Sequence, residues 1–192
     1  QTVATIFYNS TWDAEAVGDR NNWDDATNWV GNVSPQTNDV VQFYQAVSGT
    51  NVNLNGDRIV RGVRFTDGAS GNVNIRSNTL TIHDGGIAVE PYSTGAHAIR
   101  SAIAMARNQN WTNASGVDFT LGGTISGTST ATKRGAGRIV LTGSNSFSSV
   151  LTVAEGVLQI RHTNSLGTVG AGTVVADGAT LEAHGGGKSV SF

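Results

Sequence analysis

Residues 135–147 read GAGRIVLTGSNSF, and this stretch decides the fold. A Gly-Ala-Gly turn precedes Ile139, Val140 and Leu141, and Thr-Gly-Ser-Asn-Ser follows them. Branched aliphatic residues favour strands, whereas glycine, asparagine and serine favour the tight turns between strands. Because the stretch holds no acid, histidine or cysteine, it predicts a corner, a short buried strand and a second corner rather than the edge of an active site.

Units of the same kind recur along the chain. A pattern of an apolar residue, any residue, an acid and glycine occurs four times, with its acid at Asp67, Asp84, Glu155 and Asp177. The spacings of 17, 71 and 22 residues between these acids fit a repeat of about 17–24 residues. Runs this short become stable when they stack on a neighbouring copy, about 4.8 Å away, with their apolar residues turned inward. The pattern therefore predicts a parallel β-solenoid whose acids serve its corners.

Composition agrees with many short strands joined by turns. The chain has 192 residues with 25 glycines, 2 prolines and no cysteine, so it has no disulfide framework. Its net charge is −2, and the nearest approach to a basic cluster is Lys133 and Arg134 with Arg138. We interpret that cluster as a solvated turn and expect no nucleic-acid partner. No run approaches the roughly 18 apolar residues of a membrane span, so we expect no membrane insertion by this segment.

One segment leaves its conformation open. Residues 97–107 place Ile99, Ala102, Ile103 and Ala106 at helical spacing, and alanine favours helix. The alternation of Ile103 and Met105, with strand-like flanks, favours a solenoid strand instead. We take the strand as the prediction and keep the helix as the alternative.

The N-terminal region differs from the repeats. Residues 9–39 hold Trp12, Trp23 and Trp29 among many asparagines and the acids Asp13, Asp19, Asp24 and Asp25. We expect residues 1–44 to form an N-terminal strand and capping region, and residues 45–192 to form the solenoid, with its clearest repeat at 133–187. The tryptophans have two interpretations: a hydrophobic plug over an open solenoid end, or a sugar-binding surface on which they stack while Asp24 and Asp25 bind hydroxyls.

Residues 133–187 resemble the autotransporter-associated β-strand repeat of bacterial passenger domains. The segment KRGAGRIVLTGSNSF at 133–147 is similar to that family's pattern of lysine, Gly-x-Gly, aliphatic run, glycine and Asn-x-aromatic, and LTVAEGVLQ at 151–159 and NSLG at 164–167 follow in the usual order. WDDATNW at 23–29 and NDVVQF at 38–43 resemble the opening of large proteins that carry such modules. The resemblance implies an all-β, right-handed parallel β-helix that is exported to the cell surface or beyond, and it brings no catalytic residues.

The residues themselves give little support to catalysis or to a cofactor. No Gly-x-Ser-x-Gly or Ser-x-x-Lys arrangement is present, so we expect no enzyme. A polysaccharide-cleaving enzyme with paired acids remains a third hypothesis. Asp13, Asp19, Asp24 and Asp25 lack the spacing of a calcium loop, which favours turn chemistry over Ca²⁺. His162 and His184 lie one repeat apart but do not complete a zinc site.

The function we predict is that of an exported structural module in a cell-surface or extracellular fibre or passenger protein. It would either continue a longer solenoid or assemble end to end into filaments, and Val3, Ile6, Phe7, Val190 and Phe192 are the residues expected to pair between subunits. The alternative is a carbohydrate-binding or adhesion module in which Trp12, Trp23 and Trp29 contact a surface polysaccharide.

Overall fold

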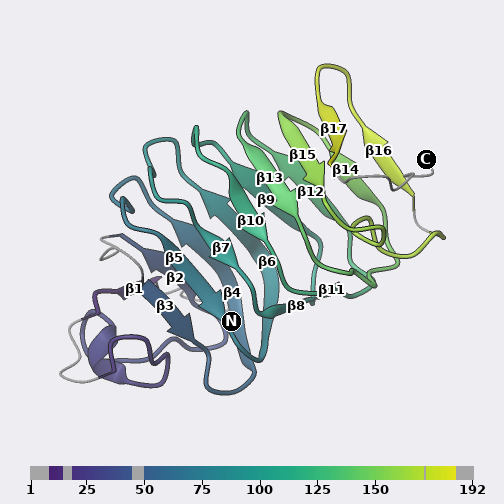
Figure 1. Cartoon of the computed structure of the whole chain (residues 1–192). Coiled ribbons are helices and arrows are strands. Elements are labelled where there is room, and N and C mark those ends of the chain that lie inside the picture. Colours follow the sequence, from purple (N-terminus) through teal and green to yellow (C-terminus); the bar gives the residue numbers. More distant parts are fainter. Residues whose placement is uncertain (1–8, 15–18, 45–49, 171, 185–192) are drawn as a thin grey trace, which may run out of the picture.

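The computed structural model describes residues 9–14, 19–44, 50–170 and 172–184. The chain winds into a parallel β-solenoid whose coils follow one another from the N-terminal to the C-terminal end (Figure 1). Two parallel sheets form its walls: a ten-stranded sheet, here called sheet A, and a seven-stranded sheet, called sheet B. The predicted all-β solenoid is therefore confirmed.

Each coil contributes at least one strand to a wall. Sheet A contains β1 (Asn9–Trp12), β2 (Val40–Phe43), β4 (Arg58–Phe65), β6 (Thr79–Val89), β8 (Ala102–Met105), β9 (Gln109–Asn113), β11 (Ile125–Ser126), β12 (Ala131–Arg134), β14 (Leu151–Val153) and β16 (Thr173–Val175). Sheet B contains β3 (Thr50–Asn53), β5 (Val73–Arg76), β7 (Ala98–Ile99), β10 (Phe119–Leu121), β13 (Arg138–Leu141), β15 (Val157–Ile160) and β17 (Thr180–Ala183). Within the described residues the one helical element is the 3₁₀ turn η1 (Ala26–Asn28).

The strand registers give the length of a coil. From β2 onward, paired residues are 19 to 24 positions apart, as in the pairs of Arg138 with Val157 and of Ile87 with Trp111. All of these pairs are parallel, and most strands between the ends of a sheet pair with a strand of the coil before and one of the coil after. The ladder in sheet A runs from β1 through β2 into β4 and so crosses residue 44. The division of the chain into a cap and a solenoid at that residue stays a prediction.

The 17-residue spacing of Asp67 and Asp84 was misleading as a coil length. Phe65 pairs with Val89, so the residue one coil above Asp67 lies well beyond Asp84. Asp84 instead lies inside β6, next to the register shift between β4 and β6, where its carboxylate contacts the Arg61 guanidinium at 3.2 Å. By contrast, the motifs that end in Gly156 and Gly178 do stack, because Val153 pairs with Val175.

The segment at 97–107 is extended, and the helical alternative is wrong. β7 pairs with β5 and β10, while β8 pairs with β6 and β11. The alternation of Ile103 and Met105 places both side chains in the core, where they are buried. Of the residues at helical spacing, Ile99 lies on β7 and Ala102 and Ile103 lie on β8, whereas Ala106 follows β8 and is exposed. The bend between the two strands is at Ser101, which is buried.

Apolar columns run through the solenoid because the registers align one inward residue per coil. One column in sheet B joins Val52, Ile75, Ile99, Leu121, Leu141 and Ile160, which are buried. An aromatic column stands beside sheet A, where the Phe43 and Phe65 rings stack at 5.3 Å between centroids. Removal of this apolar surface from water, at about 25 cal/mol per Å², is the main driving force for stacking the coils.

The tryptophan-rich region lies at the N-terminal end of the solenoid (Figure 1). Trp12, Trp23 and Trp29 are all buried. The Trp12 and Trp23 rings meet the Trp29 ring edge-on, at 4.8 and 4.9 Å between centroids, and Trp12 also contacts Phe43. The Trp29 indole donates a hydrogen bond to the Trp23 carbonyl at 2.9 Å. This arrangement is the predicted plug.

A buried histidine joins two coils on the inside of the solenoid. The His97 ring stacks on Phe65 with 4.5 Å between centroids. Its Nδ1 accepts a hydrogen bond from the Val73 amide at 3.3 Å, so Nε2 carries the proton and donates to Ser93 Oγ at 2.8 Å. Ser93 Oγ in turn donates to the Ala69 carbonyl. Burial lowers the pKa of His97 to about 4, so the ring is neutral at pH 7.

This neutral histidine predicts a specific acid sensitivity. An ordinary histidine has a pKa near 6.5, so between about pH 6.5 and 4 the unfolded chain binds a proton that the folded chain does not. The free energy of unfolding should therefore be unaffected by His97 above pH 7 and should fall by roughly 3 kcal/mol as the pH drops from 6.5 to 4. Urea unfolding of wild type and His97→Gln across this range measures the effect.

The His83→Gln variant serves as the control, because His83 lies only half-buried on β6. We expect His97→Gln to lose most of the pH dependence and His83→Gln to keep it. Equal slopes for wild type and His97→Gln would contradict the neutral buried ring.

Candidate functional site

The centre of the predicted repeat is a lysine inside the solenoid. Lys133 lies on β12, where it pairs with Trp111 of the coil before and Val153 of the coil after. Both neighbours are fully buried, and so is Lys133, with 0% of its surface exposed. Because side chains alternate along β12, this long cationic side chain points inward and lies within an apolar column.

Three carbonyl groups surround the buried ammonium. Lys133 Nζ donates to the Gly135 carbonyl at 2.5 Å, to the Gly137 carbonyl at 2.6 Å and to the Glu155 carbonyl at 2.8 Å. An ammonium group has three protons to donate, so this set satisfies it completely. Two acceptors belong to the corner that follows β12 and the third belongs to the corner one coil later, so Lys133 ties the two corners together.

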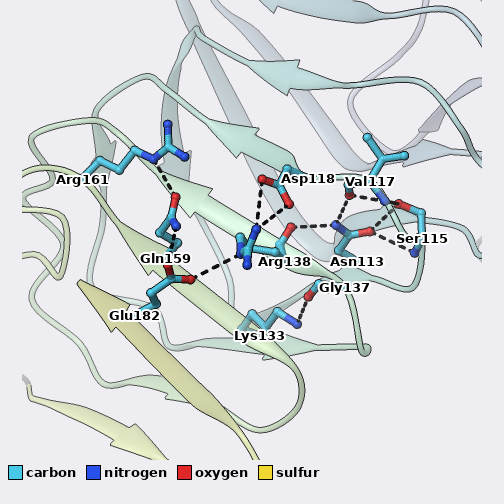
Figure 2. A network of polar contacts seen from close by, with 10 residues as sticks. All are labelled: Asn113, Ser115, Val117, Asp118, Lys133, Gly137, Arg138, Gln159, Arg161 and Glu182. Atoms are coloured by element: carbon cyan, nitrogen blue, oxygen red, sulfur yellow. Dashed lines mark hydrogen bonds and ion pairs between the residues drawn. The ribbon is translucent and has the colours of Figure 1, made fainter. Parts of the chain in front are cut away.

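Burial also changes the titration of Lys133. Desolvation lowers its pKa to about 8, while the negative charge of Glu155 acts in the opposite direction. The side chain therefore remains protonated at pH 7 and keeps all three donors. Figure 2 shows the lysine directed at the Gly137 carbonyl from within the coil.

The Gly-Ala-Gly corner has the conformation that this contact needs. Gly135 has φ +78°, and a Cβ there would collide with the Asn113 carbonyl of the coil below. Gly156 repeats the arrangement one coil later, with φ +62° and the Gly135 carbonyl beneath it. Any other residue would meet both the backbone strain and the neighbouring coil. Glu155 completes the corner, because its carboxylate accepts a hydrogen bond from the Gly135 amide at 2.6 Å.

The interpretation of Lys133 as part of a solvated turn is therefore wrong. Only Arg134 and Arg138 of that cluster reach solvent, with side-chain exposures of 50% and 40%. The signal in the sequence was the alternation of Ala131 and Lys133, which places the lysine on the same face of the strand as a core alanine.

A buried asparagine closes the corresponding corner one coil earlier. Asn113 is fully buried at the end of β9. Its side-chain amide donates to the Val117 carbonyl at 2.8 Å and to the Arg138 carbonyl at 2.7 Å, and its oxygen accepts from the Ser115 amide and hydroxyl. Figure 2 shows these contacts converging from two coils. Asn113 thus also joins neighbouring corners from the inside.

Asn145 makes a third internal connection, at another corner. Its oxygen accepts from the Ile125 amide of the coil before at 2.9 Å, and its amide group donates to the Ser165 carbonyl of the coil after at 2.6 Å. A single side chain therefore bridges three successive coils. This residue is the asparagine of the Asn-x-aromatic pattern, and Phe147 of the same pattern is buried beside it.

Other corners use the same chemistry at the surface. In each case a side-chain oxygen accepts a backbone N–H from an adjacent coil; the acceptors are Asp57, Asp67, Asn72, Asn78 and Asn108. Unpaired backbone donors at a corner are costly when they are shielded from water. The prediction that Asp67 and Glu155 serve the corners is confirmed, although their partners lie in the next or the preceding coil.

A shallow pocket of about 400 Å³ lies on the outside of these corners. Its lining residues are Ala114, Ser115, Gly116, Asp118, Ala136, Gly137, Arg138 and Val157. Arg138 contacts Asp118 at 3.3 Å and Glu182 at 3.4 Å, so both carboxylates are held by one guanidinium (Figure 2). Such an arrangement suits stabilisation of neighbouring coils.

The residues predicted to bind carbohydrate lie together at the N-terminal end, but their groups are already engaged. The three indole rings are buried in the plug, so none offers a free face for a sugar. Asp24 forms an ion pair with Arg58 at 2.5 Å, and Asp25 caps η1 through the Thr27 amide. Carbohydrate binding by this region stays a prediction. The three tryptophans themselves offer no exposed ring on which a sugar could stack.

The remaining predicted sites are only partly covered by the structure. Val3, Ile6, Phe7, Val190 and Phe192, expected to mediate self-assembly, lie outside the described residues. Among the residues that are described, no three histidine, aspartate or glutamate side chains gather as a metal site would require. Asp19 instead accepts the Asn21 amide as a turn acceptor, and Ca²⁺ binding stays an untested expectation.

Comparisons with known proteins agree with the geometry. The passenger-associated-transport-repeat family model matches residues 132–160. This range begins on β12 next to Lys133 and ends with β15, so it includes the lysine, the Gly-Ala-Gly corner and Glu155. Searches of curated proteins and of solved structures gave no match. In the described part of the chain, no helix is long and apolar enough to cross a membrane.

The class of protein follows from these observations. The chain is a parallel β-solenoid that carries a passenger-type transport repeat in its C-terminal half. The resemblance found in the sequence is confirmed.

Replacing Lys133 tests the internal lysine. Lys133→Met keeps the length of the side chain but leaves three carbonyls without their charged donor, so we expect the free energy of unfolding to fall by about 3 kcal/mol. Arg134→Met is the matched control: it removes the same charge from the adjacent residue, whose side chain is half exposed, and should change stability by less than about 1 kcal/mol. Urea unfolding measures both. Similar losses in the two variants would contradict the role given to Lys133.

Proposed function

We propose that this chain is a structural module of an exported passenger protein, which acts as a long, stiff and protease-resistant spacer at or beyond the cell surface. The observation that carries the proposal is the coincidence of the transport repeat with the internal lysine, in a solenoid whose parallel ladders continue through both sheets. The residues that define the repeat serve to hold one coil on the next.

Stiffness follows from how the coils are joined. Every interior strand is hydrogen-bonded on both edges, and Lys133, Asn113 and Asn145 add contacts between successive corners. Bending the solenoid would break backbone hydrogen bonds on one side and the apolar columns inside. Proteases require local opening of the backbone, and opening one interior coil exposes both of its neighbours.

The two finer expectations remain open within this proposal. End-to-end assembly would extend the same ladders with a second copy, and adhesion would require a ligand surface other than the buried tryptophans. Neither is needed for a spacer, because the length and rigidity of the solenoid are properties of a single chain.

Export can be tested directly. The chain, with an epitope tag, is placed between a cleavable export signal and an outer-membrane translocator in a Gram-negative host. We expect surface exposure of the tag and persistence of the solenoid when intact cells are treated with protease. Lys133→Met should reach the surface in smaller amount or be cleaved faster, whereas Arg134→Met should match wild type. Retention of the wild-type chain inside cells that display a control passenger, or its rapid cleavage at the surface, would refute the proposal.

A further inference from the structure

The outer face of sheet B carries a column of cationic side chains. Arg76 follows Ile75 of β5, and one coil later Arg100 follows Ile99 of β7. The column continues through equivalent positions, each directly after the last residue of the next strand: Gly122, Thr142, Arg161 and His184. Backbone hydrogen bonds maintain this alignment, since each of these amides from Arg100 onward donates to the carbonyl of the preceding coil.

The three arginines of this column are oriented by amides rather than by acids. Arg76 Nε donates to Asn53 Oδ1 at 2.9 Å, Arg100 Nε to Asn74 Oδ1 at 3.4 Å, and Arg161 Nε to Gln159 Oε1 at 2.6 Å. A neutral acceptor positions the guanidinium without cancelling its charge. In Figure 2 the terminal nitrogens of Arg161 extend away from Gln159. Within the described residues, none of the three arginines forms an ion pair with a carboxylate.

Arginines on sheet A behave differently. Arg61 contacts Asp84, Arg64 contacts Glu90, and Arg134 contacts Glu155, all within 4 Å. On sheet B, Arg138 is likewise paired with Asp118 and Glu182, but the three arginines of the column have no carboxylate partner. The column on sheet B is thus a local positive surface on a chain whose net charge is −2.

We propose that this column binds a linear acidic polysaccharide that lies along the solenoid axis. Adjacent coils are about 4.8 Å apart, so Arg76 and Arg100 can bind one carboxylate or sulfate together. Arg161 lies three coils beyond Arg100, at about 14 Å. Gly122, between them, has no side chain, and the nearest atoms to its Cα side are the Thr142 hydroxyl and the Cγ and Nη1 of Arg100. A polymer with anionic groups along its length reaches both positions, whereas a small anion reaches one.

The surroundings of the arginines favour a sugar polymer over a nucleic acid. Asn53, Asn74 and Thr142 offer hydrogen-bonding groups suited to hydroxyls. Aromatic side chains, on which bases would stack, are missing from the described positions of the column. An acidic polysaccharide is also the polyanion that an exported spacer meets at the cell surface. The inference rests on the proposed function only in this choice of a polysaccharide over a nucleic acid.

Binding of defined polymers to the purified chain tests the inference. Fluorescently labelled polygalacturonate and dextran sulfate are titrated at about 150 mM salt, with neutral dextran and oligothymidylate as comparisons. We expect the acidic polysaccharides to bind and neutral dextran not to bind. The affinity for the acidic polysaccharides should fall as the salt concentration rises. Arg76→Gln/Arg100→Gln/Arg161→Gln should weaken binding at least tenfold.

The matched control is Arg61→Gln/Arg64→Gln/Arg134→Gln, which removes the same charge from sheet A and should change affinity less than twofold. Equal weakening by both triple variants, no binding of either acidic polysaccharide, or tighter binding of oligothymidylate would each overturn the inference. Thermal unfolding verifies that the variants fold. If the sheet B triple variant does not fold, the single variant Arg100→Gln replaces it and should weaken binding about threefold. An unchanged affinity of that single variant would overturn the inference. The export experiment is independent, so a failure here leaves the proposed function standing.

Discussion

Everything in this molecule depends on the register between successive coils. A parallel ladder joins each coil to the next in both sheets, and a slip by one residue would turn every inward side chain to the solvent. Because coil length varies between 19 and 24 residues, equal spacing alone does not maintain this register. Apolar columns align the strands, and contacts at the corners absorb the differences in length.

The buried polar residues show how the corners contribute. Lys133, Asn113 and Asn145 each satisfy backbone groups of more than one coil from inside the solenoid. An apolar residue would fill the same space but would leave carbonyls unpaired, and the penalty for that is larger than the net gain from one hydrogen bond. Such fully satisfied contacts disfavour alternative registers, because a shifted coil would lose its acceptors. The transport repeat covers Lys133 and Asn145, which links its sequence pattern to coil stacking.

Sequence reasoning reached the architecture because short strands and glycine corners leave a clear local pattern. It predicted the extended conformation of residues 97–107 and the corner roles of Asp67 and Glu155. It missed what depends on the neighbouring coil. The spacing of Asp67 and Asp84 imitated a coil length, since nothing local marks the register shift within β6. Lys133 resembled a surface residue because its acceptors come from backbone, which the sequence does not display.

The N-terminal tryptophans and the sheet B arginines illustrate the same limit. The sequence favoured a plug for Trp12, Trp23 and Trp29 and kept a sugar-binding surface as the alternative, and their mutual packing shows the plug. Arg76, Arg100 and Arg161 are far apart in the sequence, and their spacing alone does not predict that they align. The column can be recognised only when the length of each coil is known, because the lengths differ from coil to coil.

Amide hydrogen exchange followed by mass spectrometry tests the central claim most directly. If register and internal contacts join the coils into one ladder, peptides from β4 through β15 should exchange slowly and together in both sheets, and exchange should be faster at β16 and β17, where Val174 and Val175 are 53% and 42% exposed. Protection limited to residues 132–160, with fast exchange in the preceding coils, would show that the repeat folds alone and would contradict the continuous solenoid.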